Sequence, residues 1–528
     1  MITAIRIQNL RSLKDTGFIS IKPLTILLGA NSTGKSTFLR SFLLFAQSVN
    51  KRLRGPISWF DDSLVDFGDF YTAINAEAKE NKEPMRFSFK IARSERERYL
   101  LRHKFNNWNS VNKISTITDY EFSISLACVE GETYINEITY KEGDLDVKAT
   151  IASRNAVVQF YVNGKQFETC EQLKWTYGLY TLILPSFELK NKDSEKRAFI
   201  SVVSENIKNF IKQRSNRKLA DDSKIYSLFG KTVSDKQELL NYIIEKYRIK
   251  SFSKYVKENE WTVESVEFNQ LYGYLGINYF MNVFNILDMQ LASFYGGSSY
   301  IAPARAEANR YYRTQGLQVL DIDPYGRNLQ EFIASLDGEQ KVSYQEYTKK
   351  ILKVSIDTKH QEGHQSIVLK SDLGDFNIAD VGFGYSQILP IITKLWYITS
   401  ARHHALGRSR NLYYYGPSEE NVNILIEQPE LHLHPAYQAR VADAIMEAAV
   451  LSKEKLKPRN LIVETHSEVF INRIGRRVKE NRFNIEDVNV VLFDKGIGDK
   501  NTKVRQLTFK PNGQIQGWPF GFFDPEND

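Results

Sequence analysis

The chain has 528 residues, of which 42% are hydrophobic and 25% charged, and its formal net charge is +7. This length exceeds one ordinary domain, so we expect two or three structural units, and the mild positive charge permits contact with nucleic acid without demonstrating it. Two cysteines, Cys128 and Cys170, exclude a disulfide framework, and no apolar run reaches about 18 residues, so we expect a cytoplasmic protein with no membrane span.

The first 300 residues change pattern three times. Short alternating and apolar runs predict two or three strands within residues 1–28, followed by a helix from about Lys35 to Val49. Alternating runs with turn signals then predict an antiparallel β unit, and helical periodicity without sustained heptads follows it. We therefore divide the chain into four segments: a core N-terminal part at 1–84, a β subdomain at 85–190, a helical insertion at 191–299 and a core C-terminal part at 300–528.

Strands and helices alternate again in the last third of the chain. The patterns predict strands at 365–373, 377–381, 422–428, 460–465 and 488–493, and helices at 386–400, 435–450 and 467–478. Short, fully apolar strands between helices are typical of a mostly parallel sheet that is covered on both faces. The predicted fold class is α/β, with a mixed sheet, an antiparallel β subdomain and an inserted helical region.

The stretch "GANSTGKST" matches the phosphate-loop pattern G-x-x-x-x-G-K-[ST], and it follows an apolar strand and opens a helix. Glycines let successive backbone N–H groups turn toward phosphate oxygens, and the helix N-terminus adds positive potential. We expect Lys35 to reach the β- and γ-phosphates and Ser36 to bind Mg²⁺. The predicted cofactors are ATP and Mg²⁺, and the candidate nucleotide-binding residues here are Gly29, Asn31, Ser32, Thr33, Gly34, Lys35, Ser36 and Thr37.

The stretch "ILIEQPELHLHP" begins as an apolar strand and ends in an acid, Glu427. If this strand lies beside the phosphate-loop strand, Glu427 can hold Mg²⁺ directly or through water. The next position usually orients or deprotonates the attacking water, and Gln428 can position water but is a very poor base. Glu430 can take that role if the chain turns back, so the choice between the two stays open. His432 and His434 have no third ligand nearby, which favours loop packing over metal binding.

Two further stretches carry candidate residues. His466 follows the end of the strand predicted at 460–465, where it can contact the γ-phosphate or the attacking water, or simply cap the next helix. Gly382 and Gly384 form a short glycine-rich loop before Ser386, which can serve as the N-cap of the helix that follows. A loop of this kind is either a turn with a cap or an anion-binding site.

Together these stretches resemble the ABC/SMC-type ATPases, and within them the branch related to RecF, to the OLD nucleases and to the AAA15 and AAA21 groups. The resemblance covers roughly residues 1–75 and 300–524. In that family two heads sandwich two ATP molecules, which implies that Gly384 and Ser386 touch the γ-phosphate of a partner head and that the chain forms a homodimer or higher oligomer. Gln428 in place of the usual acid implies slow or conditional hydrolysis rather than none.

The same resemblance raises the question of an effector. The chain ends soon after the last core strand, with no room for the Toprim nuclease domain of OLD proteins, so DNA cleavage is expected from a partner. This organisation resembles Septu-type antiphage ATPases, which work with an HNH-type nuclease, sometimes beside a retron. The alternatives are a RecF-like repair ATPase that binds DNA directly and, less favoured, a transport ATPase subunit.

Direct contact with DNA or RNA rests on two basic stretches. Residues 92–108 and 208–218 interleave basic and aromatic side chains, as phosphate contact and base stacking require. Acidic residues within the first stretch favour the plainer interpretation, a solvated helix face.

Overall fold

The computed structural model of the chain places its residues in two compact units. Unit 1 consists of Met1–Phe18, Lys51–Phe60 and Asp66–Ala292, and unit 2 of Ile19–Asn50, Asp61–Val65 and Ser293–Asp528. The structure describes residues 1–51, 53–93, 97, 119–151, 158–167, 173–177, 182–190, 196–215, 222–229, 233–313, 319, 321–361, 363–400, 422–454, 459–496 and 498–518. The boundaries predicted at 84, 190 and 299 stay predictions.

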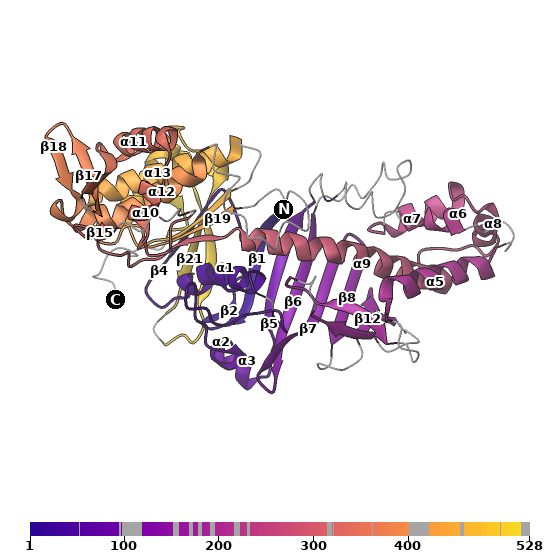
Figure 1. Ribbon diagram of the computed structural model, residues 1–528. Coiled ribbons are helices and arrows are strands. Elements are labelled where there is room, and N and C mark those ends of the chain that lie inside the picture. The colour runs from indigo at the N-terminus through magenta and orange to yellow at the C-terminus, as the bar shows by residue number, and fades with distance from the viewer. Residues whose placement is uncertain are drawn as a thin grey trace. The chain divides into compact units, whose positions relative to one another are not determined.

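A large antiparallel sheet forms the centre of unit 1 (Figure 1). Its strands follow the order β10-β9-β8-β7-β6-β5-β1-β2. Their bounds are β1 Ile2–Leu10, β2 Leu13–Asp15, β5 Met85–Ala92, β6 Asp119–Val129, β7 Glu132–Glu142, β8 Leu145–Ile151, β9 Val158–Val162 and β10 Lys165–Phe167. Buried and half-buried side chains alternate strictly along β8, so one face of the sheet is apolar. A second, small sheet pairs β11 Leu173–Thr176, β12 Ser186–Lys190 and β13 Lys196–Ala198.

The described part of unit 1 also contains helices, of which α9 packs on the large sheet. Their bounds are α2 Phe70–Ala73, α3 Ala76–Glu80, α5 Phe199–Gln213, α6 Asp222–Tyr226, α7 Lys236–Glu245, α8 Lys250–Glu258 and α9 Val266–Gly296. The ring of Phe280 in α9 contacts Tyr140 of β7 and Phe160 of β9, with centroids 5.7 and 6.4 Å apart. The last four residues of α9 belong to unit 2.

Three described basic residues of these stretches, Arg93, Lys208 and Lys212, form ion pairs within unit 1, and Arg214 donates to the Phe210 carbonyl. Arg93 is fully buried, with Nη2 2.9 Å from Glu142, and Lys208 lies 3.1 Å from Asp222. Lys212 also pairs with Asp222, at 2.8 Å. The other residues of the first stretch, except Ala92 and Glu97, and residues 216–218 of the second lie outside the described part of the chain. Arg93 and Glu97 are buried, so the solvated helix face predicted for the first stretch is wrong at these two positions. The ion pairs of Arg93, Lys208 and Lys212 do not favour a nucleic-acid surface either.

A mixed sheet of seven strands, counted over the described residues, forms the centre of unit 2. Its order is β14-β19-β20-β4-β21-β22-β23, parallel from β14 to β21 and antiparallel beyond. The bounds are β4 Leu24–Gly29, β14 Ser299–Ile301, β19 Val422–Glu427, β20 Arg459–Glu464, β21 Val488–Asp494, β22 Lys503–Phe509 and β23 Ile515–Gln516. The sequence suggested that β19 lies directly beside β4. In the structure β20 lies between these two strands.

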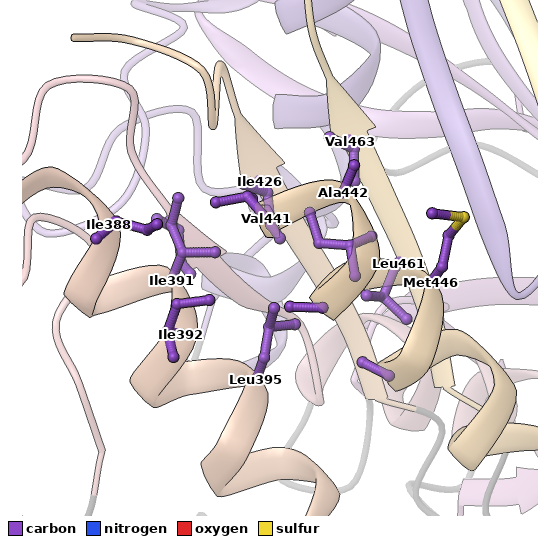
Figure 2. Close-up of a cluster of buried hydrophobic side chains, with 14 of the residues drawn as sticks. Ile388, Ile391, Ile392, Leu395, Ile426, Val441, Ala442, Met446, Leu461 and Val463 are labelled. Carbon is purple, nitrogen blue, oxygen red and sulfur yellow. The ribbon is translucent and has the colours of Figure 1, made fainter. Parts of the chain in front are cut away.

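The described α-helices of unit 2 are α1 Lys35–Val49, as predicted, α10 Leu329–Ala334, α11 Gly338–Leu352, α12 Phe383–Thr399, α13 Pro435–Glu454 and α14 Glu468–Lys479. Of these, α1 and α13 contact strands of the seven-stranded sheet, and α12 and α14 pack against α13. Figure 2 shows Leu395 of α12 and Val441 of α13 gathered with Ile426 of β19 and Val463 of β20, all of them buried. This core fixes the strand ends on which the site is built.

A second, smaller sheet of unit 2 contains β15 Tyr312–Arg313, β16 Ser355–Gln361, β17 His364–Ser371 and β18 Gly374–Asn377. The short strand β3, Ile19–Ser20, is not part of this sheet. The strand predicted at 377–381 is wrong, because Ile378–Asp380 form a 3₁₀ turn that Asn377 caps through its side chain. The predicted fold class is confirmed: the chain is α/β, with a mixed sheet, an antiparallel sheet and added helices. Over the described residues, none of the helices combines the length and apolar character needed to cross a bilayer.

Candidate active site

The phosphate loop connects the buried strand β4 to helix α1. Residues 30–32 of the loop are exposed, whereas Gly29 is buried and a Cβ at its position would lie 2.2 Å from the carbonyl oxygen of Phe493. Gly34 has φ 94°, a left-handed conformation that glycine adopts without strain. Thr33 Oγ1 donates to the Ala30 carbonyl at 2.9 Å and so closes the loop. The loop is therefore shaped by its own hydrogen bonds, with its outer backbone accessible.

Lys35 and Ser36 face the end of strand β20. The Lys35 ammonium donates to the Ala30 carbonyl at 2.6 Å and lies 3.8 Å from Glu464. Ser36 Oγ donates to Glu464 Oε1 at 2.9 Å. Burial lowers the pKa of Lys35, although the charges of Glu464 and Glu430 oppose this. Burial and the charge of Glu427 raise the pKa of Glu464 to about 7 against the opposing effects of Ser36, Lys35 and Arg40.

Glu427 ends strand β19, directly opposite Glu464 in the parallel register. Its two carboxylate oxygens accept from Arg40 Nε and Nη2 of helix α1, each at 2.8 Å. This bidentate pair raises the pKa of Arg40. Burial and the Glu427 charge also raise the pKa of Tyr300 on β14. Glu427 is thus buried at the strand end, but a cation of the protein already binds both of its oxygens.

Gln428 and Glu430 lie in the turn after β19. Gln428 has φ 43°, and its backbone N–H donates to the Glu464 carbonyl at 2.8 Å. Glu430 turns back toward β20, as its proposed role requires, and accepts from Thr465 Oγ1 at 2.8 Å and from the His466 N–H at 2.7 Å. Burial raises the pKa of Glu430 against these hydrogen bonds.

His466 lies beside the phosphate loop. Burial and the charge of Lys35 lower the pKa of its imidazole, so the ring is neutral near pH 7. Its Nε2 is buried and has no hydrogen-bond partner within the described part of the chain. The helix cap after β20 is instead Ser467, whose side chain accepts from Phe470 N–H. The alternative role of His466 as a helix cap is therefore excluded.

Arg305 binds the backbone of the turn that follows β19. It is 5% exposed, and its Nη2 donates to the carbonyls of Glu427 and Gln428 at 3.1 and 3.2 Å. Burial lowers its pKa to about 10, with the charge of Glu430 opposing. Its backbone exchanges two hydrogen bonds with the side chain of Gln387 in helix α12. Arg305 therefore joins the glycine-rich helix start to the turn that carries Gln428.

The glycine-rich loop differs from the prediction at Ser386. Helix α12 begins at Phe383 with Gly382 as its N-cap, so Ser386 lies within the first turn. Its Oγ donates to the Phe383 carbonyl at 2.6 Å, and the residue is 6% exposed. The N-cap prediction for Ser386 is therefore wrong, and its hydroxyl is not free to bind an anion. Gly384, by contrast, has nothing closer than 3.8 Å to the position of an added Cβ.

The two histidines after Glu430 serve the packing of their loop. The ring of His432 contacts Phe383, with centroids 5.1 Å apart, and His434 Nδ1 accepts from the Ala436 N–H at 3.3 Å. No cluster of three or more His, Cys, Asp or Glu side chains able to hold a metal ion occurs in the described residues. Divalent cations such as Mg²⁺ prefer oxygen ligands, and a bound nucleotide would supply some of them. Ser36 and the unpartnered, buried Glu464 Oε2 fit such an ion.

The structure brings together the phosphate loop, Glu427, Gln428, Glu430 and His466 at one edge of the sheet, whereas the candidate nucleotide-binding residues Gly384 and Ser386 lie on another element, at the start of α12. The sequence analysis did not identify three residues that lie at this edge of the sheet: Arg40, Arg305 and Glu464. Glu464 carried a signal, since it ends an apolar strand just before the singled-out histidine. Arg40 and Arg305 carried none, because their partners lie 387 and 122 positions away.

The phosphate loop between a buried strand and a helix, with carboxylates at the ends of the neighbouring strands, is typical of a P-loop nucleotide-binding protein. A family model described as an AAA ATPase domain, AAA_15, matches residues 1–471, so the chain belongs to that family.

Comparisons with solved structures give weaker likenesses. An SMC head bound to the C-terminal winged-helix domain of ScpA is 11% identical, with a TM-score of 0.32 and coverage of 96% of this chain and 98% of that one. An Smc head with an extended coiled coil, bound to the C-terminal domain of ScpA derived from Pyrococcus furiosus, is 12% identical, with a TM-score of 0.31 and coverage of 96% of each chain. The SMC head domain from Thermotoga maritima is 10% identical, with a TM-score of 0.28 and coverage of 96% of this chain and 98% of that one. The search of curated proteins found no match.

Proposed function

We propose that the chain binds ATP with Mg²⁺ on the phosphate loop and hydrolyses it slowly. Lys35 would bind the β- and γ-phosphates, and the backbone of Asn31 to Gly34 would receive the phosphate oxygens in its exposed loop. Mg²⁺, when bound, would neutralise phosphate charge, with Ser36 as one of its ligands. These roles agree with the ATPase family to which the chain belongs.

One observation carries the proposal of a working but slow site. The imidazole of His466 is neutral, is near Lys35 and keeps a buried Nε2 without a partner among the described residues, so it is poised to accept or donate one hydrogen bond to a ligand. The position next to Glu427 is the amide of Gln428, which can orient water but hardly deprotonates it. Glu430 already accepts two hydrogen bonds, so Gln428 is the better candidate for the attacking water.

We further propose that two heads associate around ATP. The phosphate loop is exposed at residues 30–32, and Phe383 at the glycine-rich helix start is 40% exposed. Gly384 is half-buried and has no side chain of its own, so a phosphate bound to a second copy could approach its backbone more closely than at a residue with a Cβ. Because Ser386 is buried, backbone N–H groups at the N-terminus of α12 are the better candidates for that contact.

The proposed biological role is the control of a partner in the cytoplasm: an HNH-type nuclease in antiphage defence, as with the PtuA ATPase of Septu systems. The internal ion pairs of Arg93, Lys208 and Lys212 favour this role over a RecF-like clamp that binds DNA through these stretches. Affinity purification from native cells, with co-purifying protein and nucleic acid identified, separates the two. A nuclease without DNA supports the first role, and DNA without a nuclease supports the second.

The ATPase itself is tested with Lys35→Ala. Loss of one charge-assisted contact, about 1.5–3 kcal/mol, should weaken ATP binding roughly 10- to 150-fold and remove hydrolysis. Lys350→Ala is the matched control, since Lys350 is an exposed lysine that pairs with Glu447 on the surface of the same unit. Equal ATP affinity of wild type and Lys35→Ala in calorimetry would refute the phosphate-loop assignment.

A further inference from the structure

We propose that Glu464 is the carboxylate that shares the nucleotide-bound Mg²⁺ with Ser36, while Arg40 keeps Glu427 away from the ion. This assignment rests on the proposed ATPase function and deepens it. It moves the acidic ligand from the strand that the sequence motif marks, β19, to its neighbour β20.

The position of Glu464 is the first reason. Its Oε1 accepts a hydrogen bond from Ser36 Oγ at 2.9 Å. Ser36 is the expected Mg²⁺ ligand, so this carboxylate oxygen already lies close enough to Ser36 for one ion to bind both. Its Oε2 is buried and has no hydrogen-bond partner among the residues described. The side chain is only 3% exposed. A buried carboxylate oxygen without a donor costs free energy, and a divalent cation supplies the missing partner.

The position of Glu427 is the second reason. Both of its oxygens bind the planar fork of Arg40 at 2.8 Å, which is the strongest side-chain pairing available to a carboxylate. For Glu427 to bind the ion, this bidentate pair must break and the Arg40 charge must be pushed outward. Glu464 needs no such exchange, because Lys35 stands 3.8 Å from it, farther than a hydrogen bond.

The strand order explains why the proposed acidic ligand lies on β20 and not on β19. Strand β20 is directly beside β4, whereas β19 is one strand further from the phosphate loop. The ends of neighbouring parallel strands meet at one edge, so the side chain ending β20 reaches the start of α1 first. Arg40, one turn further along α1, then meets the acid that ends β19.

Mn²⁺ is the probe for the test, since its electron paramagnetic resonance signal reports binding without turnover. Mn²⁺ affinity is measured for the full chain at saturating ATP, and ATP affinity is measured separately in EDTA. Glu464→Gln should weaken Mn²⁺ binding at least about tenfold. Glu427→Gln is the matched variant, and it should change Mn²⁺ affinity by less than about threefold. In EDTA, Glu464→Gln should bind ATP as well as wild type or better, because a negative charge near the phosphates is removed.

A double-mutant cycle keeps the test independent of small folding effects. If Ser36 and Glu464 share one ion, Ser36→Ala and Glu464→Gln should be strongly non-additive in Mn²⁺ affinity, whereas Ser36→Ala and Glu427→Gln should add. Weakened Mn²⁺ binding in Glu427→Gln with unchanged binding in Glu464→Gln would overturn the assignment. Failure of the ATPase proposal itself is visible separately, as absent ATP binding by wild type in EDTA.

Discussion

Replacing Arg305 by methionine tests whether a buried arginine positions the attacking-water turn. The guanidinium makes two hydrogen bonds to backbone carbonyls, at 3.1 and 3.2 Å, both through Nη2. Such bonds from a charged donor contribute about 1.5–3 kcal/mol each at best. Its Nε and Nη1 are buried with no partner in the described residues, which costs roughly 1–3 kcal/mol for each group. These terms nearly cancel, so Arg305→Met should lower stability by no more than about 2 kcal/mol.

Turnover should respond more strongly than stability. Gln428 is held at φ 43°, a left-handed conformation that costs about 1–2 kcal/mol for a non-glycine residue. Without the two donors from Arg305, the turn can relax and carry the Gln428 amide out of position. If that strain is the driving force, kcat should fall about 5- to 30-fold. ATP affinity should stay within about threefold, because Arg305 contacts the turn rather than the phosphate loop.

The assay compares kcat, KM and thermal unfolding of wild type, Arg305→Met and Arg310→Met. Arg310 is the matched control, since it lies in the same segment but is 55% exposed and pairs with Asp380 on the surface. Unchanged kcat in Arg305→Met, or an equal loss in Arg310→Met, would refute the positioning role. A large loss of ATP affinity with normal kcat would refute it as well.

Three further changes test other residues of unit 2. Gln428→Glu should preserve or raise kcat if this position serves the attacking water; complete loss of turnover would point to Glu430. Gly384→Arg should prevent an ATP-dependent increase of mass in light scattering while one head still binds ATP, and normal dimers would contradict the assignment of this loop. Burial opposes ionisation of Asp443, but hydrogen bonds from Arg477 and Arg473 outweigh it and lower the pKa of this carboxyl. Its contribution to the free energy of unfolding is therefore fully present above about pH 4 and is lost as the pH falls. Asp443→Asn should remove that acid dependence from urea midpoints, and an unchanged pH profile would refute it.

Much of the local structure could be predicted because its causes are contiguous in the sequence. The helix Lys35–Val49 has the predicted bounds, since its apolar face and the loop before it are written in adjacent residues. The phosphate-loop pattern likewise needs only eight consecutive residues. The apolar runs at 422–428, 460–465 and 488–493 are strands, within a residue or two of the predicted ends. The 3₁₀ turn at 378–380 was missed because the five residues Asn377 to Val381 are too few for their pattern to distinguish a turn from a strand.

The tertiary structure alone decided which of these pieces meet. Parallel strands become neighbours through sheet order, and no local pattern states that β20 separates β19 from β4. That order places Glu464 on Ser36, 428 positions away, and Glu427 on Arg40. Likewise Ser386 is a plausible cap in sequence, but the helix starts three residues earlier and buries it. The sequence determined the chemistry available at the strand ends; the packing of the sheet determined which carboxylate faces the phosphate loop and which faces an arginine.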